Sequence, residues 1–142
     1  CYVADTDEQA IAEAREHIEF LFNDLLNMAR FMFFPPGYTS RDSMRRVVAA
    51  KQSIMGGRRT IEALIEHGVI ICGSPDTVRK KIIACHRQLG FSHFMILPQF
   101  GSMPHELTVK NLRLFAKEVL PAIQSLGDKD YRGFNINRVT AE

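Results

Sequence analysis

The sequence predicts an α/β fold in which short parallel strands alternate with longer helices. Three apolar stretches, residues 1–4, 69–72 and 92–98, have the length and composition of buried strands. Each is followed by a segment whose apolar residues recur every three or four positions, the spacing of an amphipathic helix. Strands that alternate with helices pair in parallel through right-handed crossovers. Ligands of such folds bind beyond the carboxyl ends of the strands.

The first strand leads directly into a long helix. Thr6 is a suitable N-cap, and the acidic residues after it lie where the helix dipole favours negative charge. Apolar residues then recur at helical spacing as far as Met32, and Pro35–Gly37 is expected to end the helix.

Two further helices are expected before the second strand. One runs from about Arg41 to Ser53 and ends at Gly56–Gly57. The other is short, from Thr60 to His67, and closes at Gly68, a residue type that favours helix C-termini.

The turn after the second strand allows two interpretations. Gly73 permits a sharp turn, Ser74 is a good N-cap, and Pro75 suits the first position of a helix that runs to Leu89. A strand, a glycine turn and a helix N-terminus also form an anion site, because the free N–H groups point at a ligand above the strand. The residues alone fit both a helix start and a phosphate cradle.

The third strand, residues 92–98, is followed by a loop and by the last helix, from Glu106 to Ile123. After Leu126 the sequence is polar and irregular, so we expect residues 127–142 to form an extended or flexible tail. The first strand begins at residue 1, and we expect the chain to be truncated, starting within a longer protein.

Composition limits the partners and the compartment. The net charge of +2 over 142 residues gives no strong attraction to nucleic acid, and no apolar run approaches the length that spans a bilayer. The three cysteines show no metal-ligand spacing, which favours a reducing compartment and a cytoplasmic protein without a bound metal. We therefore expect neither nucleic acid nor membrane as a partner.

Several motifs together resemble the C-terminal end of the bacterial luciferase-like monooxygenases. They are the Gly-Ser-Pro helix start, "LGFSHFMI", "QFGSMPHE" and "LRLFAKEVLP", and "YVADTDEQAIAEA" is similar to the segment after the sixth strand of that family. These enzymes are flavin-dependent (β/α)8 TIM barrels, and some relatives use a deazaflavin. The resemblance implies that residues 1–126 are the C-terminal part of such a barrel, a helix-rich fragment with about three parallel strands. A complete barrel has eight strands and about 250 residues.

The resemblance also implies an activity. Reduced FMN, supplied by a separate flavin reductase, would be used with O2 to oxygenate a small organic substrate. Much of the flavin site would lie on earlier strands, so the isolated fragment is expected to be inactive. The alternatives are a deazaflavin-dependent oxidoreductase of the same superfamily and a non-catalytic half-barrel that acts as an interaction module. Unpaired strand edges further predict that the chain self-associates as a homo-oligomer, swaps elements or rearranges its helices.

Four residues are candidates for cofactor binding: Gly73, Ser74, Gln99 and Gly101. Gln99 and Gly101 follow the third strand, and a glycine there would let the backbone approach a ring closely. The alternatives are a helix start at Ser74 and an ordinary polar loop around Gln99. His105, in the first turn of the last helix, is a candidate general acid, but no catalytic residue is identified.

Overall fold

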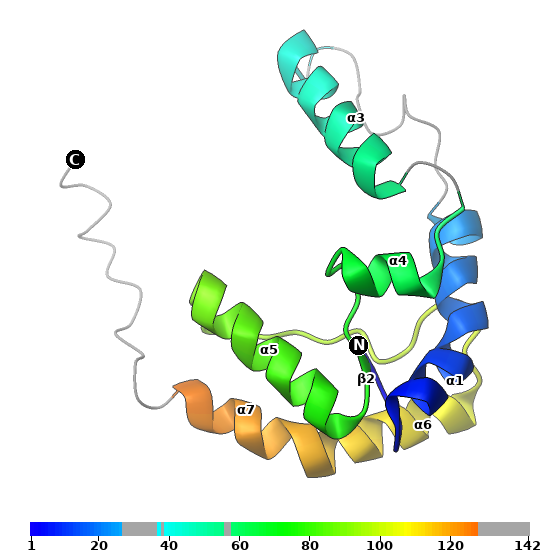
Figure 1. Cartoon of the computed structure of the whole chain (residues 1–142), viewed down its shortest axis with the longest axis vertical. Coiled ribbons are helices and arrows are strands. Elements are labelled where there is room, and N and C mark those ends of the chain that lie inside the picture. Colours follow the sequence, from blue (N-terminus) through cyan, green and yellow to red (C-terminus); the bar gives the residue numbers. More distant parts are fainter. Residues whose placement is uncertain (27–36, 38, 56–57, 128–142) are drawn as a thin grey trace, which may run out of the picture.

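The computed structural model describes residues 1–26, 37, 39–55 and 58–127. The elements follow one another as shown in Figure 1: β1 (Tyr2–Val3), α1 (Asp7–Phe20), η1 (Leu21–Leu25), α3 (Arg41–Met55), α4 (Ile61–Glu66), β2 (Cys72–Gly73), α5 (Pro75–Leu89), α6 (His105–Leu114), η2 (Phe115–Val119) and α7 (Leu120–Gly127). The segments η1 and η2 are single stretches of π-helix that continue α1 and α6. Helices therefore surround a very small sheet.

The sheet consists of β1 and β2, which pair in parallel as predicted. Tyr2 is opposite Cys72 and Val3 is opposite Gly73. The Tyr2 N–H donates to the Ile71 carbonyl at 3.0 Å, and the Ala4 N–H donates to the Gly73 carbonyl at 3.3 Å. The carboxyl ends of the two strands consequently lie at the same edge of the molecule.

The prediction of a third strand at residues 92–98 is wrong. Residues 92–98 run without helix or strand structure, so the described part of the chain contains two paired strands and not three. The Leu97 carbonyl accepts from the amino group of Cys1 at 3.3 Å, and the Pro98 carbonyl accepts from the side-chain amide of Asn111.

Asn111, a fully buried residue of α6, lies between the start of the chain and this segment. Its Oδ1 accepts from the Val3 N–H at 2.9 Å, and its Nδ2 donates to the carbonyls of Cys1 at 3.1 Å and Pro98 at 3.0 Å. One side-chain amide thus bonds the edge of β1 that faces away from β2.

Local signals place most of the helix boundaries well. The helix α5 runs from Pro75 to Leu89 as predicted, with the Ser74 Oγ accepting from the Thr77 N–H and Gly90 in the left-handed region at its end. The last helix begins one residue earlier than predicted and continues beyond Ile123 to the end of α7. The π-helical stretch η2 precedes Pro121, which has no N–H to continue the regular hydrogen-bond pattern.

Other expectations fall partly or wholly outside the described residues. The first helix is α-helical to Phe20 and π-helical to Leu25, and its predicted continuation to Met32 lies in the segment that is not described. The expected stops at Pro35–Gly37 and Gly56–Gly57 lie mostly there as well, as do residues 128–142 of the predicted tail.

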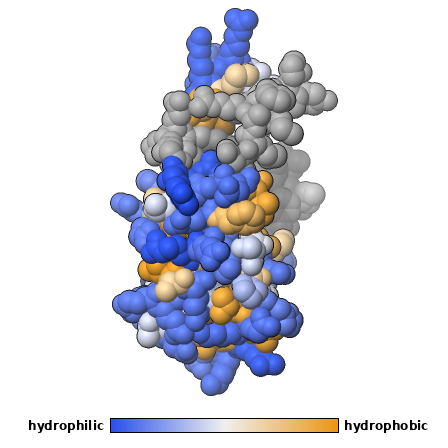
Figure 2. All heavy atoms as spheres, turned by 90° about the vertical axis from the view of Figure 1, so that its right-hand side faces the viewer, coloured by the Kyte–Doolittle hydropathy of each residue, from blue (hydrophilic) through white to orange (hydrophobic). Residues whose placement is uncertain are grey.

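The core lies on both faces of the strand pair. Tyr2 and Ala4 face a cluster built from α1 and α4, which also includes Phe100 and Met103. Val3 faces the opposite cluster, which α5 and η2 complete. This division follows from the alternation of side chains along a strand. Figure 2 shows that the side of the molecule near α1 is mostly hydrophilic, with apolar residues in small separated areas.

We predict that Asn111→Leu lowers the free energy of unfolding by at least about 2 kcal/mol, because the buried Val3 N–H loses its only partner in the described chain. Urea denaturation followed by circular dichroism measures this loss. Gln88→Leu, on the exposed side of α5, is the control and should change stability by less than about 0.5 kcal/mol. Equal effects of the two variants would contradict the role assigned to Asn111.

Candidate functional site

The Gly-Ser-Pro turn holds an anion that the chain itself supplies. The Ser74 N–H donates to Oδ1 of Asp7 at 2.6 Å, and the Thr77 hydroxyl donates to Oδ2 at 2.9 Å. The hydrogen bond from the Ser74 backbone, helped by those from Thr77 and Ser74, lowers the pKa of Asp7. A carboxylate from the first turn of α1 therefore lies where a phosphate would meet the start of α5.

Gly73 is required by this contact. Its φ of 153° is one that other residues rarely adopt. A Cβ built on Gly73 would lie 2.7 Å from Asp7 Oδ1 and 2.8 Å from Thr77 Cγ2. Asp7 and Thr77 therefore occupy the space beside Gly73 that a ligand could otherwise enter.

Gln99 and Gly101 lie in the loop before α6. Gln99 is exposed, whereas Gly101 packs against α1, where a Cβ would lie only 2.2 Å from the carbonyl oxygen of His17. The next residue, Ser102, is 2.9 Å from His17 Nδ1 through its hydroxyl oxygen. Because Gly101 has no side chain, the loop before α6 can lie close to the backbone of α1 at His17.

The predicted cofactor residues contact α1 at two separate places. Gly73 and Ser74 contact it at Asp7, and Gly101 contacts it at His17. Ten residues of helix separate these contacts, which corresponds to about 15 Å.

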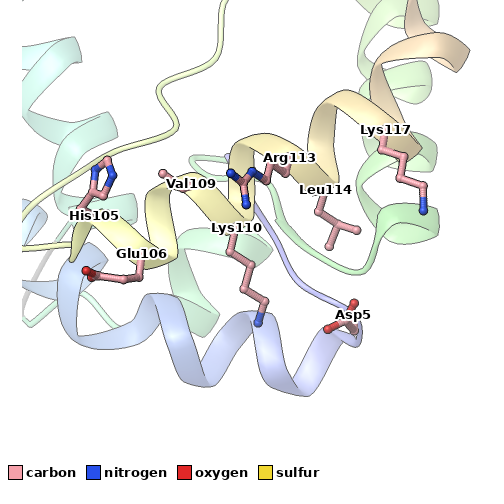
Figure 3. Close-up of a pocket in the computed structure, with 8 residues that line it drawn as sticks. All are labelled: Asp5, His105, Glu106, Val109, Lys110, Arg113, Leu114 and Lys117. Atoms are coloured by element: carbon pink, nitrogen blue, oxygen red, sulfur yellow. The ribbon is translucent and has the colours of Figure 1, made fainter.

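A groove along α6 is the candidate site that the structure does form (Figure 3). Its volume is about 540 Å³, within the range of small-molecule pockets. Most of its lining comes from α6, and it includes Asp5 at the carboxyl end of β1, where the sequence predicts ligands. The lining residues are Asp5, His105, Glu106, Val109, Lys110, Arg113, Leu114 and Lys117.

A partly buried hydrogen-bond network holds Lys110 in this groove. Figure 3 shows Lys110 pointing from α6 toward α1, where its Nζ donates to Glu13 at 2.7 Å. Glu13 also accepts from the Tyr2 hydroxyl at 2.7 Å and from the Gln9 amide at 2.8 Å. The groove is thereby anchored through Tyr2 to the core beside β1.

The hydrogen bonds of the network keep Glu13 ionised and Tyr2 protonated. Burial acts to raise the pKa of Glu13, but the hydrogen bonds from Lys110, Tyr2 and Gln9 together lower it. Burial, and then the bond to Glu13, raise the pKa of Tyr2. At neutral pH, Glu13 is an anion and Tyr2 is protonated, so the network positions the Lys110 ammonium rather than exchanging protons with a ligand.

The groove can bind a small polar molecule through charge. Lys110, Arg113 and Lys117 lie on its α6 side, and Asp5 and Glu106 offer carboxylates. Val109 and Leu114 supply apolar surface between them. His105 lies in the first turn of α6, as predicted, and it lines the groove.

The sequence analysis missed two contacts of α1, that of Asp7 with the start of α5 and that of Glu13 with Lys110 of α6, because both depend on how the helices pack. Asn111 carried a usable signal, since it is the polar residue between Leu107 and Phe115 on an otherwise apolar helix face. A polar residue at such a position predicts a buried hydrogen-bonding role.

No family model, curated protein or solved structure matches this sequence. Among the described residues, no group of three or more His, Cys, Asp or Glu side chains is arranged to hold a metal ion. All three cysteines are free thiols. Within the same residues, no helix combines the length and the apolar character needed to span a membrane.

We predict that Asp7→Asn destabilises the protein in a pH-dependent manner. The pKa of Asp7 is lowered in the folded protein, so its charge stabilises the fold above the unfolded-state pKa of about 3.9. That contribution is lost as the pH falls through the lower folded pKa. The variant should be about 1–2 kcal/mol less stable at pH 7 and should approach the wild type below about pH 3. Denaturant titrations across this pH range measure the difference.

Asp24→Asn, at an exposed position of η1, is the matched control and should follow the wild type throughout. A stability deficit of Asp7→Asn that stays constant with pH would contradict an electrostatic role for the carboxylate.

We predict that Gly101→Ala costs at least about 2 kcal/mol, because the new methyl group meets the His17 carbonyl and φ is +56°. Gly90→Ala provides the control: φ is +63°, but no atom lies within 4 Å of the new Cβ. That variant should lose only the conformational part, about 1 kcal/mol. Thermal unfolding compares the two, and equal losses would contradict the close packing of Gly101 on α1.

Proposed function

We propose that this chain is part of a flavin-dependent monooxygenase with a (β/α)8 barrel. The observation that supports this most is the parallel pairing of β1 and β2 across a helical crossover, followed by a helix that starts at Gly-Ser-Pro. This is the arrangement of consecutive units in such a barrel. It accompanies the motifs that resemble the luciferase-like enzymes.

The proposed reaction oxygenates a small organic substrate with O2 and reduced FMN, which a separate reductase supplies. The groove along α6 offers the substrate a charged and partly apolar surface at the carboxyl end of β1. The resemblance assigns most flavin contacts to earlier barrel strands, and in this structure Gly73, Ser74 and Gly101 contact α1. The free thiols agree with a cytoplasmic location for the enzyme.

We predict that the isolated chain binds FMN with a dissociation constant well above micromolar, because the resemblance places much of the flavin site on earlier barrel strands. Quenching of FMN fluorescence measures this affinity. The product of the intact gene should bind FMN at micromolar concentration or below, and a parallel titration with a deazaflavin separates the two cofactor classes.

Ser74→Ala in the intact product is the control for the helix-start interpretation. It should lose about 1 kcal/mol of stability with unchanged FMN affinity. An intact product that binds neither flavin would contradict the proposal and favour the interaction module.

A further inference from the structure

The groove along α6 carries opposite charges two helical turns apart. Glu106 and Arg113 are seven residues apart, which places them on the same face of the helix with an axial separation of about 10.5 Å. Val109 lies between them and lines the same groove. Figure 3 shows Glu106, Val109 and Arg113 following one another along the helix. The groove therefore presents a negative group, an apolar surface and a positive group in that order.

The contact between Lys110 and Glu13 leaves the Glu106 carboxylate unpaired. Lys110 lies one turn from Glu106, at the spacing that forms ion pairs on a helix. Its Nζ instead donates to Glu13 of α1 at 2.7 Å. Among the described residues, the Glu106 side chain has no hydrogen-bond or ion-pair partner. A negative group near the start of α6 is thus open to a ligand.

Arg113 supplies the opposite charge. Within the part of the chain that the structure describes, its guanidinium also has no hydrogen-bond or ion-pair partner. The charges of the two lining lysines are offset, that of Lys110 by Glu13 and that of Lys117 by Glu118, whose carboxylate lies 3.3 Å from its Nζ. A guanidinium with open donors binds a carboxylate in a planar, two-pronged arrangement. Arg113 is therefore the lining residue best suited to an anionic group.

We propose that the groove binds a small zwitterion whose ammonium and carboxylate lie at opposite ends of a short apolar chain. The carboxylate binds Arg113, the ammonium binds Glu106, and the chain lies on Val109. Contacts of about 2.8 Å at each end leave about 5 Å for the ligand between the two side chains. A ligand with a single charge would leave either Glu106 or Arg113 unpaired beside it. That this ligand is the substrate rests on the proposed function, whereas its binding does not.

Asp5 is the other carboxylate of the lining. Figure 3 shows it near Leu114 and Lys117, toward the end of the groove opposite Glu106. Leu114 and Val109 give the groove its apolar surface, and Val109 is the one that lies between Glu106 and a cation on the same helix face. The ammonium is therefore assigned to Glu106, and an Asp5 variant tests this choice.

The test measures binding to the full chain without flavin, by titration of its amide resonances. Contacts with exposed charges are weak, so ligand concentrations from about 0.1 mM to about 50 mM bracket the expected millimolar affinity. The zwitterionic probe is γ-aminobutyrate. Butyrate and butylamine each keep one of its charges, and its isomer α-aminobutyrate carries both charges at one end. The probe should bind at least about threefold more tightly than each of the other three.

Two variants separate the ends of the ligand. Arg113→Gln should weaken γ-aminobutyrate at least about threefold and leave butylamine unchanged, and Glu106→Gln should weaken it equally and leave butyrate unchanged. Arg87→Gln is the matched control, because Arg87 is exposed on α5 and does not line the groove. Unchanged far-ultraviolet circular dichroism and urea midpoint establish that the variants fold.

Three results would overturn the proposal: no binding of γ-aminobutyrate at the highest concentration, equal affinity for its isomer, or weakening by Asp5→Asn but not by Glu106→Gln. Equal effects of Arg113→Gln and Arg87→Gln would also contradict it. If γ-aminobutyrate binds as expected while the intact gene product binds neither flavin, the zwitterion site is supported and its assignment as the substrate site is overturned.

Discussion

The fold depends on one buried amide. Asn111 joins the start of the chain to the loop before α6 by satisfying the backbones of Val3, Cys1 and Pro98 together. A two-residue strand paired on one side has too few hydrogen bonds to hold its position alone. Because a helix supplies the remaining bonds, β1 lies between β2 and α6, and the two core clusters can form on its opposite faces.

The same principle explains the start of α5. Free N–H groups at a helix N-terminus require an acceptor, and a bound anion or a side chain can fill that need. Here Asp7 provides the carboxylate, and the strand-to-helix turn becomes a contact between two helices. Recognition of a phosphate at this turn would require Asp7 to move away.

Local chemistry predicts the parts of the fold that local interactions determine. Ser74, Pro75 and Gly90 specify both ends of α5 within the sequence itself, and the helix forms between them as expected. Parallel pairing of β1 and β2 follows from the order of strands and helices. Residues 92–98 are β-prone, but a strand needs a partner, and they pair with no strand among the described residues. No pattern within residues 92–98 reports whether a partner strand is present.

The candidate site was predictable to the same degree. The carboxyl end of β1 and the position of His105 followed from the order of elements, whereas the bonds among Tyr2, Glu13 and Lys110 arise only when α1 and α6 pack together. The roles of Gly73 and Gly101 illustrate the same limit. A glycine indicates close approach in the sequence, but only the structure shows that the approaching atoms belong to Asp7 and His17.

The helix α1 touches the start of α5 with Asp7 and the loop at Gly101 with His17, so it acts as a spacer between them. Inserting or deleting one residue between those two positions would rotate one end by about 100° relative to the other. Both contacts could not then form at once. Insertions and deletions in related sequences should therefore avoid residues 8–16. This should hold even at positions whose side chains face solvent and tolerate substitution.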